Sequence, residues 1–435
     1  MDKTLPATER GIFYGWWIVV ISTIALIVNN GLAVGGLPVF YKPMLSDLIA
    51  RGVTTPALAP KIVGNAATMT FLVAGVLSPL TGILIRRLNL RILMTIGCFL
   101  LGGGLVLYSR ATLPRDIYLA HFLLGSSLAC AGVAINAVLV SNWFRRLRGT
   151  AIGIAMTGTS LGGALIPLIA TPLIANYGWR TALLYVSGLV WLVLLPAIWL
   201  FMRVRPEDKG LQPDGDTIAA HPSEAESSRV LPGLTLPQAL RTPVFWMLGC
   251  AAALLFYPIF TTSQQFILYL QTPRIGMAAA TANKVQSALF LSSLSGKFFF
   301  GWLSDRLKPI QVMLLCCVVM LSGSLFLLNL NQTTAFAFIV PFGMGYGGAF
   351  VLLQLLSVTT FGARDSGAIL GAIIFIEALG GAVGSYLTGV LASRAGGDYT
   401  LAFYCVIGVT ALALLAVFAL SKLPRPQIQK RENGV

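Results

Sequence analysis

Two residues of opposite charge interrupt long apolar runs of the sequence. Lys297 stands within residues 288–303 and Glu377 stands within residues 371–381, where most other residues are hydrophobic or small. A charged side chain in a bilayer-spanning helix costs about 2.5–3.5 kcal/mol on insertion scales, so such residues usually face a cavity or a partner. An ammonium group and a carboxyl group in different helices can pair, bind a charged solute or exchange a proton. We therefore expect the function of the protein to depend on Lys297 and Glu377.

The direction of each helix predicts where these two side chains point. Side chains lean toward the N-terminus of their helix, and the loop charges make the helix of Lys297 run inward and that of Glu377 run outward. Lys297 then leans toward the bilayer centre, which favours a cavity-facing role over snorkelling to the headgroups or structural pairing. Glu377 leans toward the depth of Lys297. It is interpreted as an ion-pair partner or a proton-binding group, and the alternative is a structural carboxylate satisfied by neighbouring helices.

The composition indicates a polytopic membrane protein. Hydrophobic residues make up 56% of the 435 residues, charged residues make up 10%, and the mean hydropathy is +0.82. A soluble domain carries roughly 25% charged residues, whereas a spanning helix needs about 20 apolar residues. We therefore predict an all-α membrane protein with twelve transmembrane helices. The predicted helices cover residues 14–38, 62–85, 90–109, 116–141, 149–173, 179–202, 244–269, 280–303, 310–330, 335–360, 366–392 and 399–421.

The net charge of +15 is explained by the orientation of the chain in the membrane. With the N-terminus inside, 20 of the 30 Lys and Arg residues fall on the inner side, nine fall on the outer side, and Lys297 lies within a helix. This bias favours both termini in the cytoplasm. The basic balance is therefore a topology signal and not the mark of a nucleic-acid partner. We expect a multi-pass protein of the cytoplasmic (inner) membrane of a bacterium, surrounded by lipid.

Residue types that catalyse reactions or bind metals are scarce. The six cysteines all fall within predicted spans and have no metal-ligand spacing, so they are interpreted as small packing residues. The sequence has two histidines and no catalytic triad, metal cluster or phosphate-binding loop. We therefore expect no enzymatic activity and no cofactor.

A polar stretch divides the chain into two parts. Residues 203–243 are rich in proline and charge and are predicted to form a flexible cytoplasmic linker. The linker separates an N-terminal six-helix half at 1–202 from a C-terminal six-helix half at 244–421, and residues 422–435 form a cytoplasmic tail.

The two parts repeat at a nearly constant spacing. Residues 82–87 correspond to 301–306 at an offset of 219, and residues 153–163 correspond to 371–381 at an offset of 218. Six spans per unit leave both halves in the same orientation, which gives a parallel pseudo-two-fold axis along the membrane normal. Such an arrangement places a substrate site near mid-membrane between the halves, with alternating access by rocking.

The sequence resembles the major facilitator superfamily over essentially its whole length. Gly301-x-x-x-Asp305-Arg306 is similar to the signature loop between helices 8 and 9. The counterpart between helices 2 and 3 has Arg86 where the family usually has an acid, which weakens the charge lock of that half. The resemblance implies the major facilitator fold and a gating role for these four residues.

Two further segments resemble the monocarboxylate transporters and the oxalate–formate exchangers. They are Tyr14-Gly15-Trp16-Trp17, which opens helix 1, and residues 142–155. Helix 1 lacks the acid that the animal monocarboxylate branch places before its glycine–tryptophan pair, and Gly35 stands near the position of that branch's lysine.

The resemblance implies a carboxylate-binding role for Lys297. The family carries a substrate-binding arginine four residues before the glycine of the loop motif, and here this position is Lys297 before Gly301. Lysine keeps the charge and loses the bidentate fork. Ser293 replaces the acid that the monocarboxylate branch has one turn earlier, and Glu377 stands roughly at the level of the helix-11 lysine of the oxalate–formate branch.

His121 lies in the outer part of helix 4, four residues before Gly125. The superfamily often has a proton-linked arginine at this position, so the resemblance implies proton coupling by a histidine that titrates near neutral pH. The alternative is a hydrogen-bonding histidine near the membrane interface.

Helices 1, 4, 7 and 10 line the transport path in this family, and their polar residues are candidate substrate contacts. Tyr257 and Tyr346 fall near mid-membrane and are the preferred contacts. Polar side chains at this depth must face protein or water. The other candidates in the substrate-binding set are Asn30, Asn136, Gln264 and Ser293.

Together these features predict a secondary active transporter of a small organic anion, a monocarboxylate, coupled to protons or to exchange of a second anion. Lys297 attracts the carboxylate, and Glu377 sets the charge balance or binds a proton. One alternative is proton-coupled efflux of cationic or amphipathic compounds, with Glu377 as the proton-exchanging acid. A second alternative, of a different class, is a membrane sensor that does not transport.

Overall fold

The computed structural model describes residues 13–87, 89–144, 147–215, 233–362 and 364–424. Within these residues the chain is almost entirely helical, and the pairing of Gly233 with Gly362 is an isolated bridge outside any strand. Long apolar runs form helices here because a helix satisfies all backbone hydrogen bonds within its own segment.

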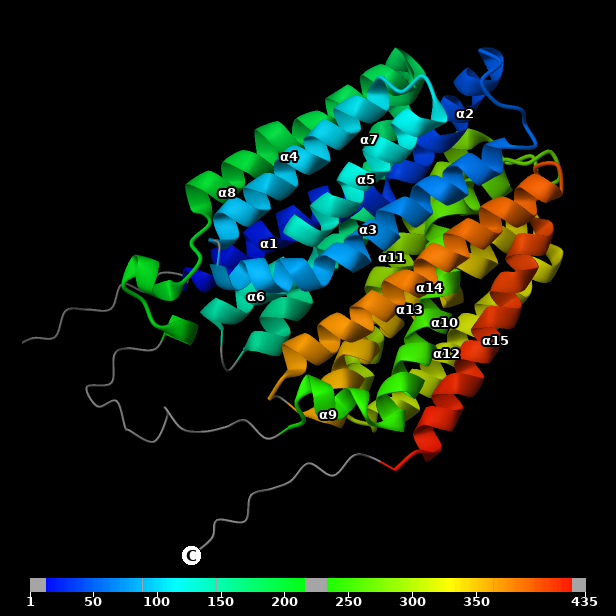
Figure 1. Ribbon diagram of the computed structural model, residues 1–435. Helices are drawn as coiled ribbons and strands as arrows, with labels where there is room; N and C mark the ends of the chain where they lie inside the picture. Colours follow the sequence, from blue (N-terminus) through cyan, green and yellow to red (C-terminus); the bar gives the residue numbers. More distant parts are fainter. Residues whose placement is uncertain (1–12, 88, 145–146, 216–232, 363, 425–435) are drawn as a thin grey trace, which may run out of the picture.

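The N-terminal half of the chain forms eight α-helices, several of which join end to end into longer rods (Figure 1). These elements are α1 (Gly15–Asn30), η1 (Gly31–Gly35), η2 (Leu37–Phe40), α2 (Tyr41–Ala50), α3 (Ala59–Arg87), α4 (Leu90–Ser109), α5 (Pro114–Ala131), α6 (Val133–Trp143), α7 (Arg148–Leu189), η3 (Val190–Leu194) and α8 (Leu195–Phe201).

The C-terminal half follows two short 3-10 turns, η4 (Pro206–Lys209) and η5 (Pro213–Gly215). Its elements are α9 (Leu236–Leu240), α10 (Pro243–Leu270), α11 (Ala279–Ser304), α12 (Pro309–Ser324), η6 (Leu325–Asn329), α13 (Gln332–Phe361), α14 (Ser366–Arg394) and α15 (Thr400–Lys422). The segment around α9 is held on the end of α13 and the start of α14. The Leu234 amide donates to the Phe361 carbonyl at 2.8 Å, and the Leu236 amide donates to the carboxylate of Asp365, the N-cap of α14, at 3.1 Å.

Ten helices of the described chain are long and apolar enough to span a membrane. One of them, Gly149–Phe201, has 53 residues and holds two crossings, because Gly178 adopts a left-handed φ of 76° between them. α11 is absent from the ten, since Lys284, Lys297 and several polar residues lower its hydropathy, yet it runs for 26 residues beside α7 and α13. The described residues thus form twelve crossings, which confirms the predicted fold class.

Equivalent helices of the two halves make equivalent contacts, as a parallel repeat requires. The fifth crossing packs on the first in both halves, α7 on α1 and α14 on α10. In each case a glycine permits the close approach. A Cβ atom at Gly162 would meet the Ile27 carbonyl oxygen, and one at Gly380 would meet the Ala253 carbonyl oxygen. Between the halves, α3 packs on α14 and α7 packs on α11, which are again equivalent pairs.

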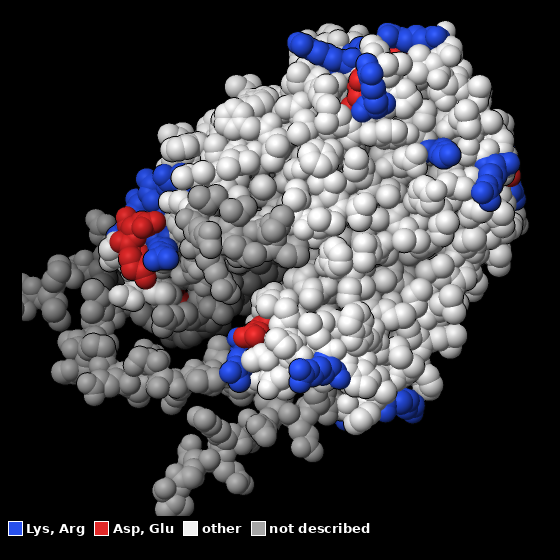
Figure 2. All heavy atoms as spheres, in the orientation of Figure 1, with Lys and Arg blue, Asp and Glu red and all other residues white. Residues whose placement is uncertain are grey.

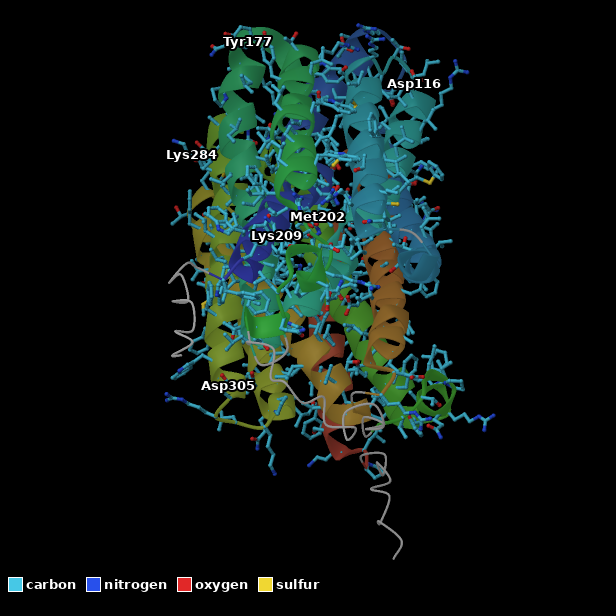
Figure 3. The ribbon with its side chains drawn as sticks, turned by 90° about the vertical axis from the view of Figure 1, so that its left-hand side faces the viewer. Asp116, Tyr177, Met202, Lys209, Lys284 and Asp305 are labelled. Atoms are coloured by element: carbon cyan, nitrogen blue, oxygen red, sulfur yellow. The ribbon has the colours of Figure 1, made fainter. Side chains whose placement is uncertain are left out.

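The two halves converge at one end of the molecule and separate at the other (Figure 1). The end near α2 is here termed the closed end, and the end near α6 and α9 the open end. Figure 2 shows the surface hollowed between the halves at the open end, and it shows Lys and Arg side chains gathered toward the two ends with a largely uncharged belt between. Asp305 lies at the opposite end from Asp116 and Tyr177 (Figure 3). This arrangement is that of a bilayer-spanning protein with an opening on one side.

Candidate functional site

A cavity of about 160 Å³ lies between the two halves. Crossings from both halves contribute to its wall, among them α1, α3, α5 and α7 on one side and α10, α11, α13 and α14 on the other. Its lining residues are Asn30, Val34, Gly35, Phe71, Ala74, Gly75, Ser78, Leu128, Ala129, Gly132, Val133, Ala134, Thr159, Phe256, Phe260, Phe290, Tyr346, Phe350, Gln354, Ile374, Glu377 and Ala378. Most of this wall is apolar, so its few polar groups determine which charged or polar atoms of a solute can be bound.

Lys297 lies beside this cavity at the interface of α11 and α7. Its side chain is buried, with 9% exposure, and its Nζ donates to the Met156 carbonyl at 3.1 Å and to the Thr159 hydroxyl at 2.5 Å. The same Nζ lies 5.7 Å from the ring centroid of Phe350. Thr159 and Phe350 both line the cavity. The ammonium group therefore lies behind the cavity wall, in contact with two of its residues and away from lipid.

α13 can approach α11 closely at this level because Gly347 has no side chain. A Cβ atom at Gly347 would clash with the Ser293 carbonyl oxygen, one turn before Lys297. The close approach brings Phe350, one turn further along α13, next to the lysine. The position of the ammonium group is thus fixed by packing within the C-terminal half and by hydrogen bonds to the N-terminal half.

Glu377 lines the cavity from α14 and is 8% exposed. The ion pairs found among the described residues join Arg51 and Arg180 to Asp47, and Arg115 to Asp116; none of them includes Glu377 or Lys297. The two buried charges are therefore not paired with each other in this conformation, and Glu377 is one of the residues that line the cavity.

The internal repeat relates the surroundings of the two charges. The offset of 218 aligns Thr159 with Glu377, and the offset of 219 aligns Ser78 with Lys297. Lys297 contacts Thr159 across the interface of α11 and α7, and Ser78 and Glu377 both line the cavity at the equivalent interface of α3 and α14. Each interface between the halves thus carries one charged residue at this level, opposite a hydroxyl-bearing residue.

Tyr346 and Asn30 also line the cavity. Tyr346 is 5% exposed, and its ring packs 5.7 Å from Phe290 and 5.5 Å from Phe350. The Oδ1 atom of Asn30 is buried and has no hydrogen-bond partner among the described residues. α1 changes to a π-helix, η1, directly after Asn30, and such turns are frequent at functional sites.

Three other candidate substrate contacts lie away from the cavity lining. Tyr257 is buried, and its hydroxyl lies beside Thr388 of α14. Asn136 is fully buried, and its Nδ2 donates to the carbonyls of Ala131 and Gly132 at 2.9 Å, which holds the break between α5 and α6. The Ser293 hydroxyl lies 3.4 Å from that of Ser160, across the interface of α11 and α7. In this conformation the three side chains contact other parts of the helix bundle, and their role as substrate contacts stays a prediction.

Gln264, a further candidate contact, joins the two halves at the closed end. Its Oε1 accepts from the Tyr41 hydroxyl at 2.7 Å, and its Nε2 donates to the Val34 carbonyl at 2.9 Å. Nearby, the Lys42 ammonium donates to the Gln271 carbonyl at 3.3 Å. These hydrogen bonds connect the C-terminal part of α10 to η1 and to the start of α2, so they must break when the closed end opens.

We expect Tyr41→Phe to favour opening of the closed end. The substitution leaves the buried Oε1 of Gln264 without a donor in the closed state, which costs about 1–3 kcal/mol. This cost corresponds to a roughly 5- to 150-fold shift of the equilibrium from the closed state toward the open state. Spin labels at Leu58 and Leu328, which are both exposed, would report the change as a longer component in their distance distribution. Tyr118→Phe is the matched control, because Tyr118 accepts its hydrogen bond from Asn65 within one half. Identical distributions for Tyr41→Phe and Tyr118→Phe would contradict the gating role.

His121 is buried within the N-terminal half. It is 1% exposed, its Nδ1 lies 2.8 Å from the Thr70 hydroxyl, and its Nε2 has no partner among the described residues. Its ring packs near the rings of Tyr41 and Tyr108. The cavity lining does not include it. A coupling role for His121 would therefore act through Tyr41 at the closed end.

The predicted gating loop lies at the end of α11. Asp305 and Arg306 are exposed, and the Arg306 guanidinium stacks on the Trp302 ring at 4.1 Å. Gly301 has open space around it, with Val351 the nearest group at 3.9 Å. Arg86 belongs to the last turn of α3, and its side chain lies outside the described part of the structure.

The phenylalanine side chains of the cavity and the partner of the lysine were not predicted from the sequence. Phe71 of α3 stacks on Phe260 of α10, with ring centroids 3.9 Å apart, and this stack joins the two halves. Phenylalanine is common in every span, so composition gave no reason to select these two. Thr159 did carry a signal, since the repeat aligns it with Glu377.

Comparison with known proteins agrees with this architecture. The sequence matches the family model described as Major Facilitator Superfamily over residues 11–385 and again over residues 274–434. A crystal structure of a bacterial homologue of the human lysosomal transporter Spinster, in an inward-facing and unoccupied conformation, aligns with a TM-score of 0.69 and 16% identity. That alignment covers 95% of this chain and 98% of the other.

Sequence relatives include both transporters and a sensor. Monocarboxylate transporter 12 of Xenopus laevis is 25% identical over 405 residues, which cover 89% of this chain and 85% of the relative. The membrane sensor protein UhpC of Escherichia coli is 24% identical over 400 residues, which cover 88% and 89%. MFS transporter asaE of Aspergillus flavus is 27% identical over 328 residues, which cover 74% and 69%. From the family match and the fold together, the chain belongs to the Major Facilitator Superfamily.

Proposed function

We propose that this protein is a secondary active transporter that moves a small organic anion, a monocarboxylate, by alternating access. The observation that carries the proposal is the buried, unpaired ammonium group of Lys297 at the edge of the central cavity. Its present partners, the Met156 carbonyl and the Thr159 hydroxyl, are neutral. A carboxylate entering the cavity beside Thr159 would offer a stronger, charge-assisted hydrogen bond.

Glu377 is the proton-binding group in this proposal. It lines the cavity, and no ion pair among the described residues gives it a cationic partner. In the internal repeat it lies at the same level as Lys297. A neutral carboxyl group and a bound carboxylate avoid like-charge repulsion in the same cavity. Glu377 would then bind a proton when Lys297 binds an anion, which gives proton symport. Exchange of one anion for another is the second coupling mode.

The direction of the opening supports an inward-facing state. The open end carries α9, and the loops with the excess of Lys and Arg fall on the same side. That excess favours the cytoplasmic side of the membrane. In this proposal both termini and the 203–243 segment lie in the cytoplasm, and the protein belongs to a bacterial inner membrane.

Proton-coupled efflux of a cationic or amphipathic compound is a second candidate. It is favoured by the fact that Glu377 lines the cavity directly, whereas Lys297 lies behind Thr159. An apolar cavity with one carboxyl group is suited to an amphipathic cation.

Flux through purified protein in liposomes separates these functions. We expect an inward proton gradient to drive accumulation of a labelled monocarboxylate and to leave a labelled lipophilic cation unmoved. Cation efflux without carboxylate uptake would establish the second candidate instead. Saturable binding of a carboxylate without any flux would indicate a sensor, which is the role in the name of the relative UhpC.

A further inference from the structure

Six aromatic rings form one continuous wall along the cavity. Successive ring centroids lie 5.7 Å apart from Phe290 to Tyr346, 5.5 Å from Tyr346 to Phe350, and 4.7 Å from Phe350 to Phe256. The series continues at 5.3 Å from Phe256 to Phe260 and ends at 3.9 Å from Phe260 to Phe71. All six residues line the cavity and come from α11, α13, α10 and α3. This set is here termed the aromatic wall.

The aromatic wall passes next to the ammonium group. The Nζ of Lys297 lies 5.7 Å from the ring centroid of Phe350, the third member of the series. A solute whose carboxylate reaches Lys297 and Thr159 therefore has its body against Phe350 and the rings beside it. Aromatic pairs favour offset-stacked and edge-to-face arrangements, so such a wall recognises a flat ring better than an aliphatic chain of the same charge.

The size of the cavity fits one ring. Its volume is about 160 Å³, close to the ~150 Å³ of an apolar cavity that holds benzene. A one- or two-carbon carboxylate would leave most of the aromatic wall in contact with water. A single-ring carboxylate would fill the space.

An unused acceptor lies on the same cavity. The Oδ1 of Asn30 is buried without a hydrogen-bond partner among the described residues, and Asn30 lines the cavity from the N-terminal half. A buried polar atom without a partner is costly. Rotation of the Asn30 side chain would turn this atom toward the cavity, where a hydroxyl or amino group on the bound ring would donate to it.

We propose that the transported anion is an aryl monocarboxylate that carries a hydrogen-bond donor on its ring. The carboxylate binds at Lys297 and Thr159, the ring lies against the aromatic wall, and the donor binds at Asn30. This inference rests on the proposed function, because it requires carboxylate transport, and it narrows that function to one class of substrate.

The test is competition for uptake in liposomes that contain the full-length protein. The probes are para-hydroxybenzoate, benzoate, cyclohexanecarboxylate and acetate, each at graded concentration against one labelled carboxylate. We expect the half-inhibitory concentration to be lowest for para-hydroxybenzoate. It should be at least threefold higher for benzoate, and for acetate at least tenfold higher than for benzoate. Cyclohexanecarboxylate that competes as well as benzoate would overturn the assignment to aryl compounds.

Two variants separate the ring contact from the donor contact. Phe350→Leu is expected to lower the preference for benzoate over acetate, measured as the ratio of their KM values, at least fivefold. Asn30→Ala is expected to abolish the preference for para-hydroxybenzoate over benzoate. Phe299→Leu is the matched control, because this phenylalanine of α11 is 41% exposed and lies outside the cavity lining.

The outcomes distinguish failure of this inference from failure of the proposed function. If all four carboxylates compete equally and uptake still requires Lys297, the aryl assignment is wrong and carboxylate transport stands. If no carboxylate is taken up or binds, both are wrong.

Discussion

Lys297→Ala is expected to remove carboxylate uptake, and Lys297→Arg is expected to retain part of it. Truncation of one partner of a buried, hydrogen-bonded charge pair costs about 2–5 kcal/mol, which is at least a roughly thirtyfold loss in kcat/KM. Arginine keeps the charge and changes the geometry of its donors, so its variant should bind the carboxylate with an altered KM. The measurement is initial uptake of a labelled monocarboxylate into liposomes at equal protein content.

Lys284→Ala is the matched control for this experiment. Lys284 lies on the same helix, α11, and is exposed near one end of it (Figure 3). Its loss removes one positive charge without altering the cavity. Because Lys297 also bonds to α7 across the two halves, elution of the variant as a monodisperse species would show that it is folded. A folded Lys297→Ala variant with unchanged uptake would refute the anion-binding role.

Glu377→Gln is expected to uncouple uptake from the proton gradient. The amide has nearly the shape of the carboxyl group but cannot exchange a proton. The proton gradient therefore has no group through which it can drive uptake. We expect gradient-driven uptake to fall about tenfold, to the level without a gradient, while exchange of internal for external carboxylate continues. Parallel measurement of pH-driven uptake and of counterflow in the same liposomes tests this split.

Glu207→Gln is the control for Glu377→Gln, since Glu207 is exposed in η4. Equal gradient-driven uptake by Glu377→Gln and by the unmodified protein would exclude Glu377 as the proton site. Loss of cation efflux in Glu377→Gln, in a protein without carboxylate uptake, would instead favour the efflux function.

The fold could be predicted from the sequence because spanning segments are long, apolar and ended by polar residues. The predicted span 90–109 has the same limits as α4, Leu90–Ser109, where Asn89 caps the helix start through a hydrogen bond to the Arg91 amide. The twelve crossings and the family are confirmed. By length and hydropathy alone, ten helices of the described chain qualify as membrane spans, because Gly178 turns the chain without a polar loop and α11 carries Lys297.

The site could be predicted only where a residue is anomalous by itself. Lys297 and Glu377 were evident because a charge within a span needs a compensating environment. The rotation of each helix about its own axis is set by packing between distant segments, which local sequence does not encode. For this reason Tyr257 and Tyr346 had equal standing in the sequence, yet Tyr346 faces the cavity and Tyr257 faces Thr388. The same reasoning explains why the hydrogen bond of Gln264 was not predicted, since its partner Tyr41 lies 223 residues away in the sequence.

Both buried charges belong to helices of the C-terminal half, α11 and α14, while Ser78 and Thr159 hold the equivalent places in the N-terminal half. A rocking motion therefore carries the lysine and the glutamate through the electric field of the membrane as a single body. When both are ionised their displacement currents cancel, and when the glutamate is protonated one positive charge remains. Moving one elementary charge through the whole field is worth about 2.3 kcal/mol per 100 mV. The reorientation of the empty carrier thus becomes sensitive to voltage only in its protonated form. The carrier with both groups ionised, and the carrier loaded with one proton and one anion, each move no net charge. Transport at this stoichiometry therefore responds to the pH gradient and not to the membrane potential.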